Sequence, residues 1–308
     1  MIAAMEAPPG LWIALTVWAA FAQTLRNTAQ RGLTASLGTL GATLVRFLYG
    51  LPFALAWLAL VHAWLAEDLP ALDWAFAAWV TLGAVAQIAA TAFLLAAMEA
   101  RSFALGVAYS KTELLQIAVF GLAFLGDPLS VPVILAVACG TLGVLLLSPA
   151  DPQRPFTAML TGLGTRPALL GLASGTGFAF AAIGYRGAAL SLEGSFLMTS
   201  ATSLAVAQFV QTLLLGGWLL WRDPGVVGAS FRLWRPSLFA GFMGAAASAG
   251  WFSAFALQSA AHVRTLGLVE LVFSYAVSMK LFRERMTRLE LAGMAFLAAG
   301  IAVITLAG

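Results

Sequence analysis

The chain has 308 residues, of which 61% are hydrophobic and only 9% are charged, and its formal net charge is +3. A soluble domain averages about 25% charged residues, so this chain has too little polar surface to cover a water-soluble globule. Its basic residues form no cluster and no aromatic RNA-binding motif accompanies them, which argues against nucleic acid as a partner. The composition therefore predicts an all-α membrane protein in contact with the lipid bilayer.

Ten apolar stretches predict ten transmembrane helices, because a hydrocarbon core of about 30 Å needs roughly 20 helical residues. The segment before the first stretch has no Lys or Arg, so we expect a retained helix there rather than a cleaved signal peptide. The predicted spans lie near residues 10–31, 37–62, 72–98, 103–124, 131–148, 168–190, 194–220, 236–258, 263–282 and 288–307.

The second half of the chain repeats features of the first. A shift of 157 residues aligns Glu113 with Glu270 and Gly143 with Gly300, and a proline-rich segment near the middle of the chain predicts a linker. Each repeat would hold five helices, and because five is odd, the second repeat must be inverted in the membrane, as in many transporters. The predicted units are a first repeat in 1–150, a linker in 151–167 and a second repeat in 168–308.

The arginines are distributed unevenly between the two sides that ten helices would define. The connections after the odd-numbered helices, with the adjoining helix ends, hold 11 arginines, Arg26 among them, whereas the opposite side holds Arg186 and Arg264. Since cytoplasmic loops carry an excess of Lys and Arg, both termini are predicted to lie outside the cytoplasm. A bacterial inner membrane is the expected location.

Two acids lie inside predicted helices, Glu113 in the fourth and Glu270 in the ninth. A charged carboxylate at a helix centre costs about 2.5–3.5 kcal/mol on insertion scales, which favours a functional role. The two acids could face one cavity and tune its charge or carry protons; the alternative is a structural hydrogen bond or ion pair. In a regular helix Lys111 would point about 200° away from Glu113, so these two are not expected to pair.

Five further residues are candidates for contact with a substrate inside the bundle. Arg46 could bind a substrate carboxylate or pair with Glu113, because a guanidinium matches the fork of a carboxylate. Gln87 could bind another polar group of the substrate. The aromatic candidates for contact with its body are Trp18, Tyr109 and Trp251. For each candidate, bracing or packing between helices is the alternative interpretation.

A family resemblance rests on two segments, each with a short acid-containing connection before the last helix of its half. They read FGLAFLGDPLSVPVILAVACGTLGVLLL and MKLFRERMTRLELAGMAFLAAGIAVITL, and Arg46 in LVRFLYGLPFALAWL is similar to an Arg-Phe often found in the second helix of the same family. The chain resembles the drug/metabolite transporter superfamily in its EamA-type branch, most closely its exporters of amino acids. Members often have a proline where Glu113 and Glu270 stand, and this departure favours a role for the acids.

The resemblance implies a secondary transporter that exports small metabolites, such as amino acids and among them aromatic ones, by alternating access around a central cavity. The alternative is a non-transporting protein, either an intramembrane enzyme or a membrane scaffold. No HExxH, GxSxG or P-loop motif is present, so no enzymatic activity, metal or cofactor is predicted. Each half alone would have exposed polar faces, so a monomer is the expected working unit.

Overall fold

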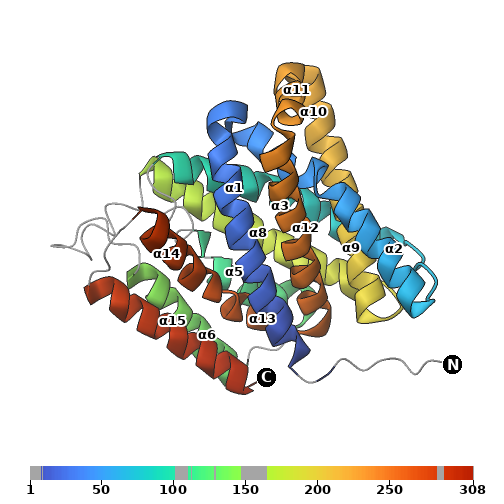
Figure 1. The fold of residues 1–308 in the computed structure, drawn as a ribbon. Helices are drawn as coiled ribbons and strands as arrows, with labels where there is room; N and C mark the ends of the chain where they lie inside the picture. The colour runs from blue at the N-terminus through green and yellow to red at the C-terminus, as the bar shows by residue number, and fades with distance from the viewer. Residues whose placement is uncertain are drawn as a thin grey trace.

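The computed structural model describes residues 8, 10–100, 110–111, 113–127, 130–146, 165–282 and 288–307. The regular elements in these ranges are helices, and none of the described residues lies in a β-strand (Figure 1). Six helical segments among them are long and apolar enough to cross a membrane. The fold is therefore that of an all-α membrane protein, as the composition predicts.

The helices follow one another with short connections. In the first half of the chain they are α1 (Leu11–Leu48), α2 (Leu51–Leu65), α3 (Trp74–Ala100), α5 (Glu113–Phe120), which a π-helical turn (Gly121–Leu125) extends, and α6 (Val131–Leu146). In the second half they are α8 (Arg166–Leu190), α9 (Phe196–Gln211) with a π-helical turn (Thr212–Gly216), α10 (Gly217–Arg222), α11 (Pro224–Arg232), α12 (Trp234–Leu257), α13 (Ala260–Leu266), α14 (Val269–Phe282) and α15 (Arg288–Ala307).

The first two helices differ from the spans predicted near 10–31 and 37–62. Helical structure continues through the predicted break, and the chain bends instead at Gly38, where φ is 65° and ψ is 173°. Glycine adopts a positive φ without steric cost because it has no Cβ. The Gln30 side chain donates a hydrogen bond of 2.7 Å to the Ala42 carbonyl across this bend. A straight helix over the 55 residues of α1 and α2 would be about 80 Å long, so the bend brings the chain back along the bundle.

The ninth predicted helix, 263–282, is also divided. α13 ends at Leu266 and α14 begins at Val269, so Gly267 and Leu268 form a break between them. The amide of Leu268 donates to the Thr265 carbonyl at 3.1 Å, an i to i+3 bond that tightens the chain at this point. The break places Glu270 in the first turn of α14.

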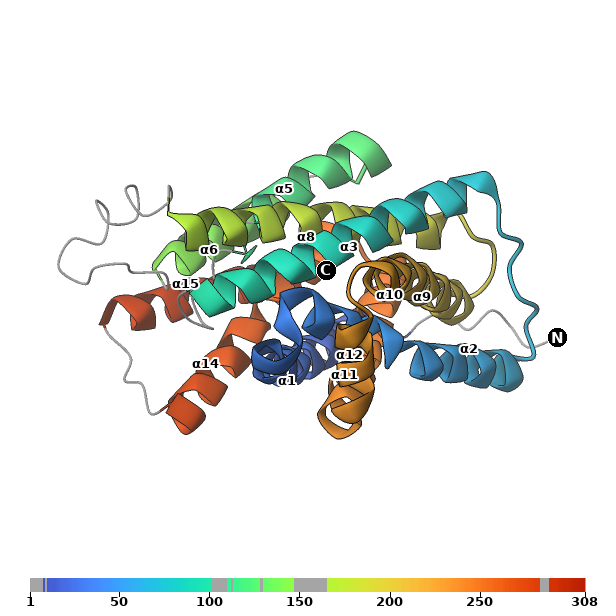
Figure 2. The ribbon, with the colours of Figure 1, turned by 90° about the horizontal axis from the view of Figure 1, so that it is seen from above.

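Three antiparallel or crossing helix pairs form the frame of the molecule. α1 packs along α12, α3 packs along α8, and α6 packs along α15 (Figures 1 and 2). Small residues permit the close approach: a Cβ built on Gly250 would lie 2.9 Å from the Cβ of Ala19, and one on Gly177 would lie 2.9 Å from that of Ala90. Such contacts between small residues are the usual means by which helices associate in lipid.

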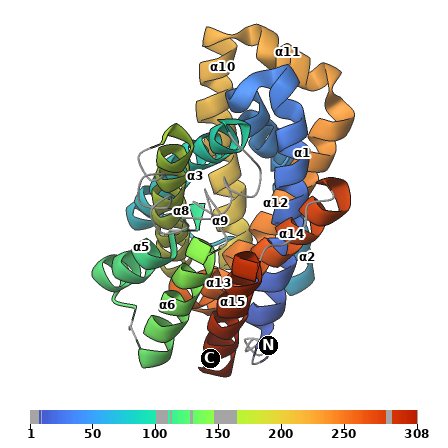
Figure 3. The ribbon, with the colours of Figure 1, turned by 90° about the vertical axis from the view of Figure 1, so that its left-hand side faces the viewer.

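The distribution of side chains is the reverse of that in a water-soluble protein. Arg26 and Arg46 are among the largest fully buried residues, while Trp74 is 85% exposed and Trp221 79% exposed. Apolar side chains on the outside and charged ones inside fit a molecule surrounded by lipid. Viewed from the side, the start of α1 and the end of α15 lie at one end of the molecule, and α10 and α11 at the other (Figure 3).

Candidate functional site

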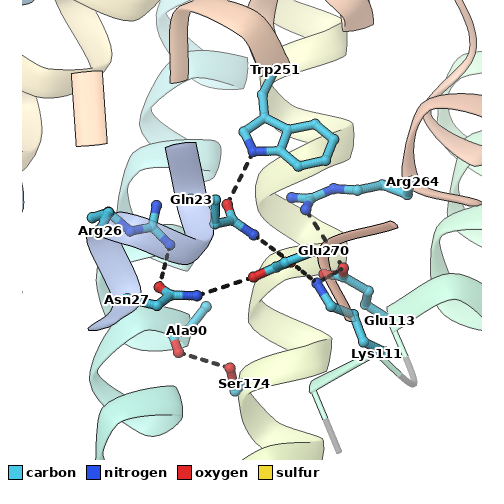
Figure 4. Close-up of polar contacts among 10 residues, drawn as sticks. All are labelled: Gln23, Arg26, Asn27, Ala90, Lys111, Glu113, Ser174, Trp251, Arg264 and Glu270. Atoms are coloured by element: carbon cyan, nitrogen blue, oxygen red, sulfur yellow. Dashed lines mark hydrogen bonds and ion pairs between the residues drawn. The ribbon is translucent and has the colours of Figure 1, made fainter. Parts of the chain in front are cut away.

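A stripe of polar side chains runs along one face of α1. Gln23, Arg26, Asn27 and Gln30 recur at intervals of three and four residues, and each is no more than 7% exposed. This spacing places them on the same side of a helix, turned toward the interior of the bundle. They supply one wall of a buried polar cluster, which we call the central cluster: Gln23, Arg26, Asn27, Lys111, Glu113, Trp251, Arg264 and Glu270 (Figure 4).

Glu270 is the most heavily bonded member of the central cluster. Its carboxylate accepts hydrogen bonds from Gln23 Nε2 at 2.8 Å, from Asn27 Nδ2 at 3.1 Å and from Lys111 Nζ at 2.5 Å. It also lies at the N-terminal end of α14, where the helix dipole favours a negative charge. With only 1% of its surface exposed, Glu270 is held by donors from three segments of the chain.

Glu113 occupies the corresponding place at the start of α5 and has longer contacts. One carboxylate oxygen lies 3.7 Å from Lys111 Nζ and 3.6 Å from an Nη atom of Arg264. The expectation that Lys111 and Glu113 point apart was wrong. It assumed one regular helix through both residues, whereas α5 begins at Glu113 and Lys111 lies in the turn before it. Lys111 therefore stands between the two acids.

Trp251 and Arg264 form the aromatic side of the central cluster. The indole Nε1 of Trp251 donates a hydrogen bond of 3.0 Å to Gln23 Oε1. The guanidinium carbon of Arg264 lies 4.7 Å from the centre of the Trp251 ring and 5.5 Å from that of Phe255. A cation over an aromatic face gains electrostatic attraction, most of all where water is excluded. Arg264 is thus held by both Glu113 and the indole.

A second polar group lies deeper between α3, α8 and α9. The amide oxygen of Gln87 accepts hydrogen bonds of 2.8 Å from the Tyr185 hydroxyl and 2.8 Å from Gln211 Nε2. One turn further along α3, Thr91 accepts a hydrogen bond of 3.0 Å from an Nη atom of Arg46. The pairing of Arg46 with Glu113 that was considered from the sequence is not formed, because Arg264 occupies that position.

The structure separates the remaining sequence candidates. Trp251 belongs to the central cluster and Gln87 to the second group, whereas Trp18 is 46% exposed and lines an apolar groove of about 410 Å³ between α1, α2, α9 and α12. Trp18 therefore contacts the lipid-facing side and not the buried polar groups. Tyr109 lies outside the described residues.

Sequence reasoning missed several members of the central cluster. Gln23 and Asn27 were not singled out, and Arg26 and Arg264 were counted as topology signals near helix ends, yet all four are buried. The regular spacing of polar residues in the otherwise apolar first helix was the available signal. Over the described residues, no group of three or more His, Cys, Asp or Glu side chains is arranged to hold a metal ion.

Comparison with known proteins gives information about the fold alone. No family model matches the chain, and no curated protein matches it. A solved structure described as "Crystal structure of protein" is 15% identical in sequence, with a TM-score of 0.70 over 96% of this chain and 96% of that one. The two chains share a fold over almost their whole lengths.

Proposed function

We propose that this protein is a secondary transporter of the bacterial inner membrane, which exports small metabolites such as amino acids, including aromatic ones, by alternating access around a central site. The observation that carries the proposal is the ion pair between Lys111 and Glu270, buried between helices of the two chain halves. Ionisable residues inside a membrane are costly and usually mark the path of a substrate or ion. The resemblance to the drug/metabolite transporter superfamily points the same way.

The proposal includes ten membrane spans. The stretch Leu11–Leu65 counts as two spans divided at Gly38, and five more segments are long enough by themselves. α5 with its π-helical turn, α6 and the 20-residue α15 complete the set. An even number of spans agrees with the position of the start of α1 and the end of α15 at one end of the molecule (Figure 3).

The proposal also includes two inverted repeats, which the pairing of helices supports. If the halves are exchanged, so that α1 corresponds to α8 and α3 to α12, the pair α1–α12 becomes the pair α8–α3, which is the other extensive contact. The pair α6–α15 becomes itself. A pseudo-two-fold axis between the halves would produce this pattern.

Individual contacts obey the same exchange. A Cβ on Gly143 would meet the Leu297 side chain at 2.8 Å, and one on Gly300 would meet the Gly140 backbone at 3.2 Å. A shift of 157 residues turns the first pair of positions into the second. The same shift relates two backbone hydrogen bonds beside the acids, Leu114 to Lys111 and Leu271 to Leu268. Both acids thus begin a helix in equivalent places.

Alternating access needs two units that move relative to each other. The helix contacts suggest one unit with α1, α12 and α14 and another with α3, α5 and α8. Lys111 and Glu113 belong to the second unit, and Glu270 belongs to the first. Separation of the units would therefore break the bond between Lys111 and Glu270 and leave Lys111 beside Glu113, which keeps its charge compensated in both states.

A flux assay with the full chain in liposomes tests this function. Uptake of labelled phenylalanine and leucine, a cationic drug and a sugar phosphate is compared with that of empty vesicles. We expect amino-acid flux above the empty-vesicle rate, and a loss of about tenfold or more in Glu270→Gln, because one buried ion pair contributes more than about 1.4 kcal/mol. The matched control is Glu193→Gln, an exposed acid that should have no effect.

Two results would count against the proposal. Flux of every tested solute at the empty-vesicle rate would contradict transport of these classes. Flux of an amino acid that is unchanged in Glu270→Gln would remove the ion pair from the mechanism. A third arm concerns coupling: flux still driven by a pH gradient in the double variant Glu113→Gln/Glu270→Gln would exclude the two acids as proton carriers.

A further inference from the structure

The buried charges of the bundle do not balance. Among the described residues, four basic side chains lie in its centre, and only two acidic ones accompany them. None of the six is more than 7% exposed. The basic ones are Arg26, Arg46, Lys111 and Arg264, and the acidic ones are Glu113 and Glu270. With all six ionised, the interior carries a surplus of positive charge.

The surplus is concentrated on two neighbouring arginines. A Cβ built on Gly244 would lie 3.1 Å from Cγ of Arg46 and 3.4 Å from Cδ of Arg26, so both side chains pass over the same glycine of α12. The absence of a side chain at Gly244 provides the space that both arginines occupy. Two guanidinium groups that lie side by side repel each other unless a negative group lies between them.

The hydrogen-bond donors of these two arginines are only partly used. Arg26 donates to Asn27 at 2.6 Å, and Arg46 donates to Thr91 at 3.0 Å, both neutral acceptors. Nε and one Nη of Arg26 and Nε of Arg46 are buried without a hydrogen-bond partner. A buried charged donor without a partner loses its hydration and gains nothing in return.

Another buried arginine of the same chain demonstrates what full compensation looks like. Arg186 makes bonds of 2.8 to 3.2 Å with both oxygens of Asp127. Its remaining Nη donates to the carbonyls of Phe255 and Gln258 at 2.8 and 2.7 Å. The sequence thus places acceptors around an arginine that has a structural role, and it leaves Arg26 and Arg46 without a carboxylate.

We infer that Arg26 and Arg46 form the binding site for the carboxylate of an organic anion, so that the preferred substrate carries a net negative charge. This inference rests on the proposed transport function and specifies its substrate class. A carboxylate offers two coplanar oxygens, which match the free edges of two guanidinium groups. The ion pairs of Lys111 with Glu270 and of Arg264 with Glu113 are already compensated, and Trp251 and Phe255 provide apolar surface for the rest of the molecule.

The charge surplus also argues against an amino acid as the best ligand of this site. A zwitterion brings a carboxylate and an ammonium group together, and the ammonium would add a further positive charge to an interior that already has too many. The two acids that could accept it are occupied by Lys111 and Arg264. An acid of the same shape without the amino group should therefore bind more tightly.

Three ligands of nearly equal shape isolate the effect of charge: 3-phenylpropanoate, phenylalanine and phenethylamine, which carry a carboxylate alone, both groups and an ammonium alone. Their affinities for the purified full chain in detergent are measured by calorimetry, with inorganic phosphate as a fourth ligand. We expect 3-phenylpropanoate to bind at least about tenfold more tightly than phenylalanine, and phenethylamine not to bind. Tighter binding of phenylalanine, phenethylamine or inorganic phosphate would overturn the inference.

Variants locate the site. Arg46→Gln and Arg26→Gln should each weaken 3-phenylpropanoate about tenfold or more, since each removes a charged donor. Arg46→Lys keeps the charge, removes the fork and should lie between, which preserves the test if a glutamine variant fails to fold. Arg232→Gln, which removes an exposed positive charge, is the matched control and should change nothing. Equal binding by all four variants would overturn the assignment.

Flux measurements separate this inference from the function on which it rests. If 3-phenylpropanoate binds through Arg26 and Arg46 but no solute crosses the liposome membrane, the anion site stands and the transport function fails. If amino acids cross and the arginine variants leave their flux and the binding of 3-phenylpropanoate unchanged, transport stands and the anion site fails.

Discussion

Lys111 is shared unequally by two carboxylates. Its ammonium group lies 2.5 Å from Glu270, within the range of a charge-assisted hydrogen bond, and 3.7 Å from Glu113, which is beyond it. Glu270 also receives two amide donors, so its charge is better satisfied than that of Glu113. One carboxylate oxygen of Glu113 is buried without a hydrogen-bond partner. The structure therefore holds one strong bond and one position ready to receive the same ammonium group.

The first prediction concerns the energy of this pair. Removing one partner of a buried ion pair leaves an uncompensated charge and costs about 3–5 kcal/mol, whereas replacing both partners is often nearly neutral. We expect Glu270→Gln to lower the melting temperature of the purified protein clearly, because Lys111 loses its short contact. The double variant Lys111→Met/Glu270→Gln should recover most of the loss, which thermal unfolding in detergent measures.

The comparison variant is Glu113→Gln, whose contacts with Lys111 and Arg264 are longer. It should destabilise the protein less than Glu270→Gln does. A double variant as unstable as the sum of its two single variants would contradict the pairing, because independent sites add and coupled ones do not.

The part of the central cluster that could be predicted from the sequence is the part that breaks a rule of composition. A carboxylate in an apolar stretch is conspicuous, so Glu113 and Glu270 were candidates at once, and Trp251 was among the aromatic ones. Gln23 and Asn27 carry no such mark, because neutral amides are common in membrane helices. Their role depends on the position of Glu270, which is about 240 residues away in the chain and reaches them only through the fold.

At the scale of helices, glycines set the distance between α6 and α15. A Cβ on Gly300 would lie 2.9 Å from the Ala136 carbonyl oxygen and 3.2 Å from the Gly140 amide nitrogen. Both are backbone atoms, which cannot turn away as a side chain can. The two helices would have to move apart to accept even a methyl group.

The second prediction is therefore that Gly300→Ala destabilises the protein by about 1–3 kcal/mol, the usual cost of overpacking. The matched control is Gly32→Ala in α1, where a Cβ would meet nothing within 4 Å. Alanine there should be neutral or stabilise the helix by about 0.5–1 kcal/mol. Thermal unfolding of the two variants under the same conditions measures the difference, and equal melting temperatures would show that α6 and α15 do not pack as described.

The helices themselves were largely predictable, and their interruptions were not. Long apolar stretches indicate helices whatever their neighbours are, since lipid leaves the backbone no other partner. The bend of α1 lies at Gly38 and not at Gly32, although both are glycines in similar surroundings, because the bend is fixed by contacts such as that of Gln30 with Ala42. The break at Leu268 has no sequence signal beyond Gly267.

For the whole molecule, the orientation argument changes in detail but not in direction. Arg26 was counted on the predicted cytoplasmic side and Arg264 on the opposite side, and both are buried in the bundle. Neither can therefore contribute to the positive-inside signal. The exposed arginines near α10 and α11, Arg222, Arg232 and Arg235, remain on one side. The connection between α2 and α3 carries acids instead, among them the exposed Asp68 and Asp73.

The third prediction is the direction in which the molecule faces. Since arginines are retained on the cytoplasmic side, the turn between α10 and α11 should lie inside the cell and the connection between α2 and α3 outside. Single cysteines at Asp223 and Asp68, both exposed, are introduced into a chain whose own cysteine is replaced by Cys139→Ala. A membrane-impermeant maleimide added to intact spheroplasts should label Asp68→Cys at once and Asp223→Cys only after the membrane is opened. Labelling in the reverse order would invert the orientation, and labelling of both in intact spheroplasts would mean that an odd number of spans does not separate these two positions.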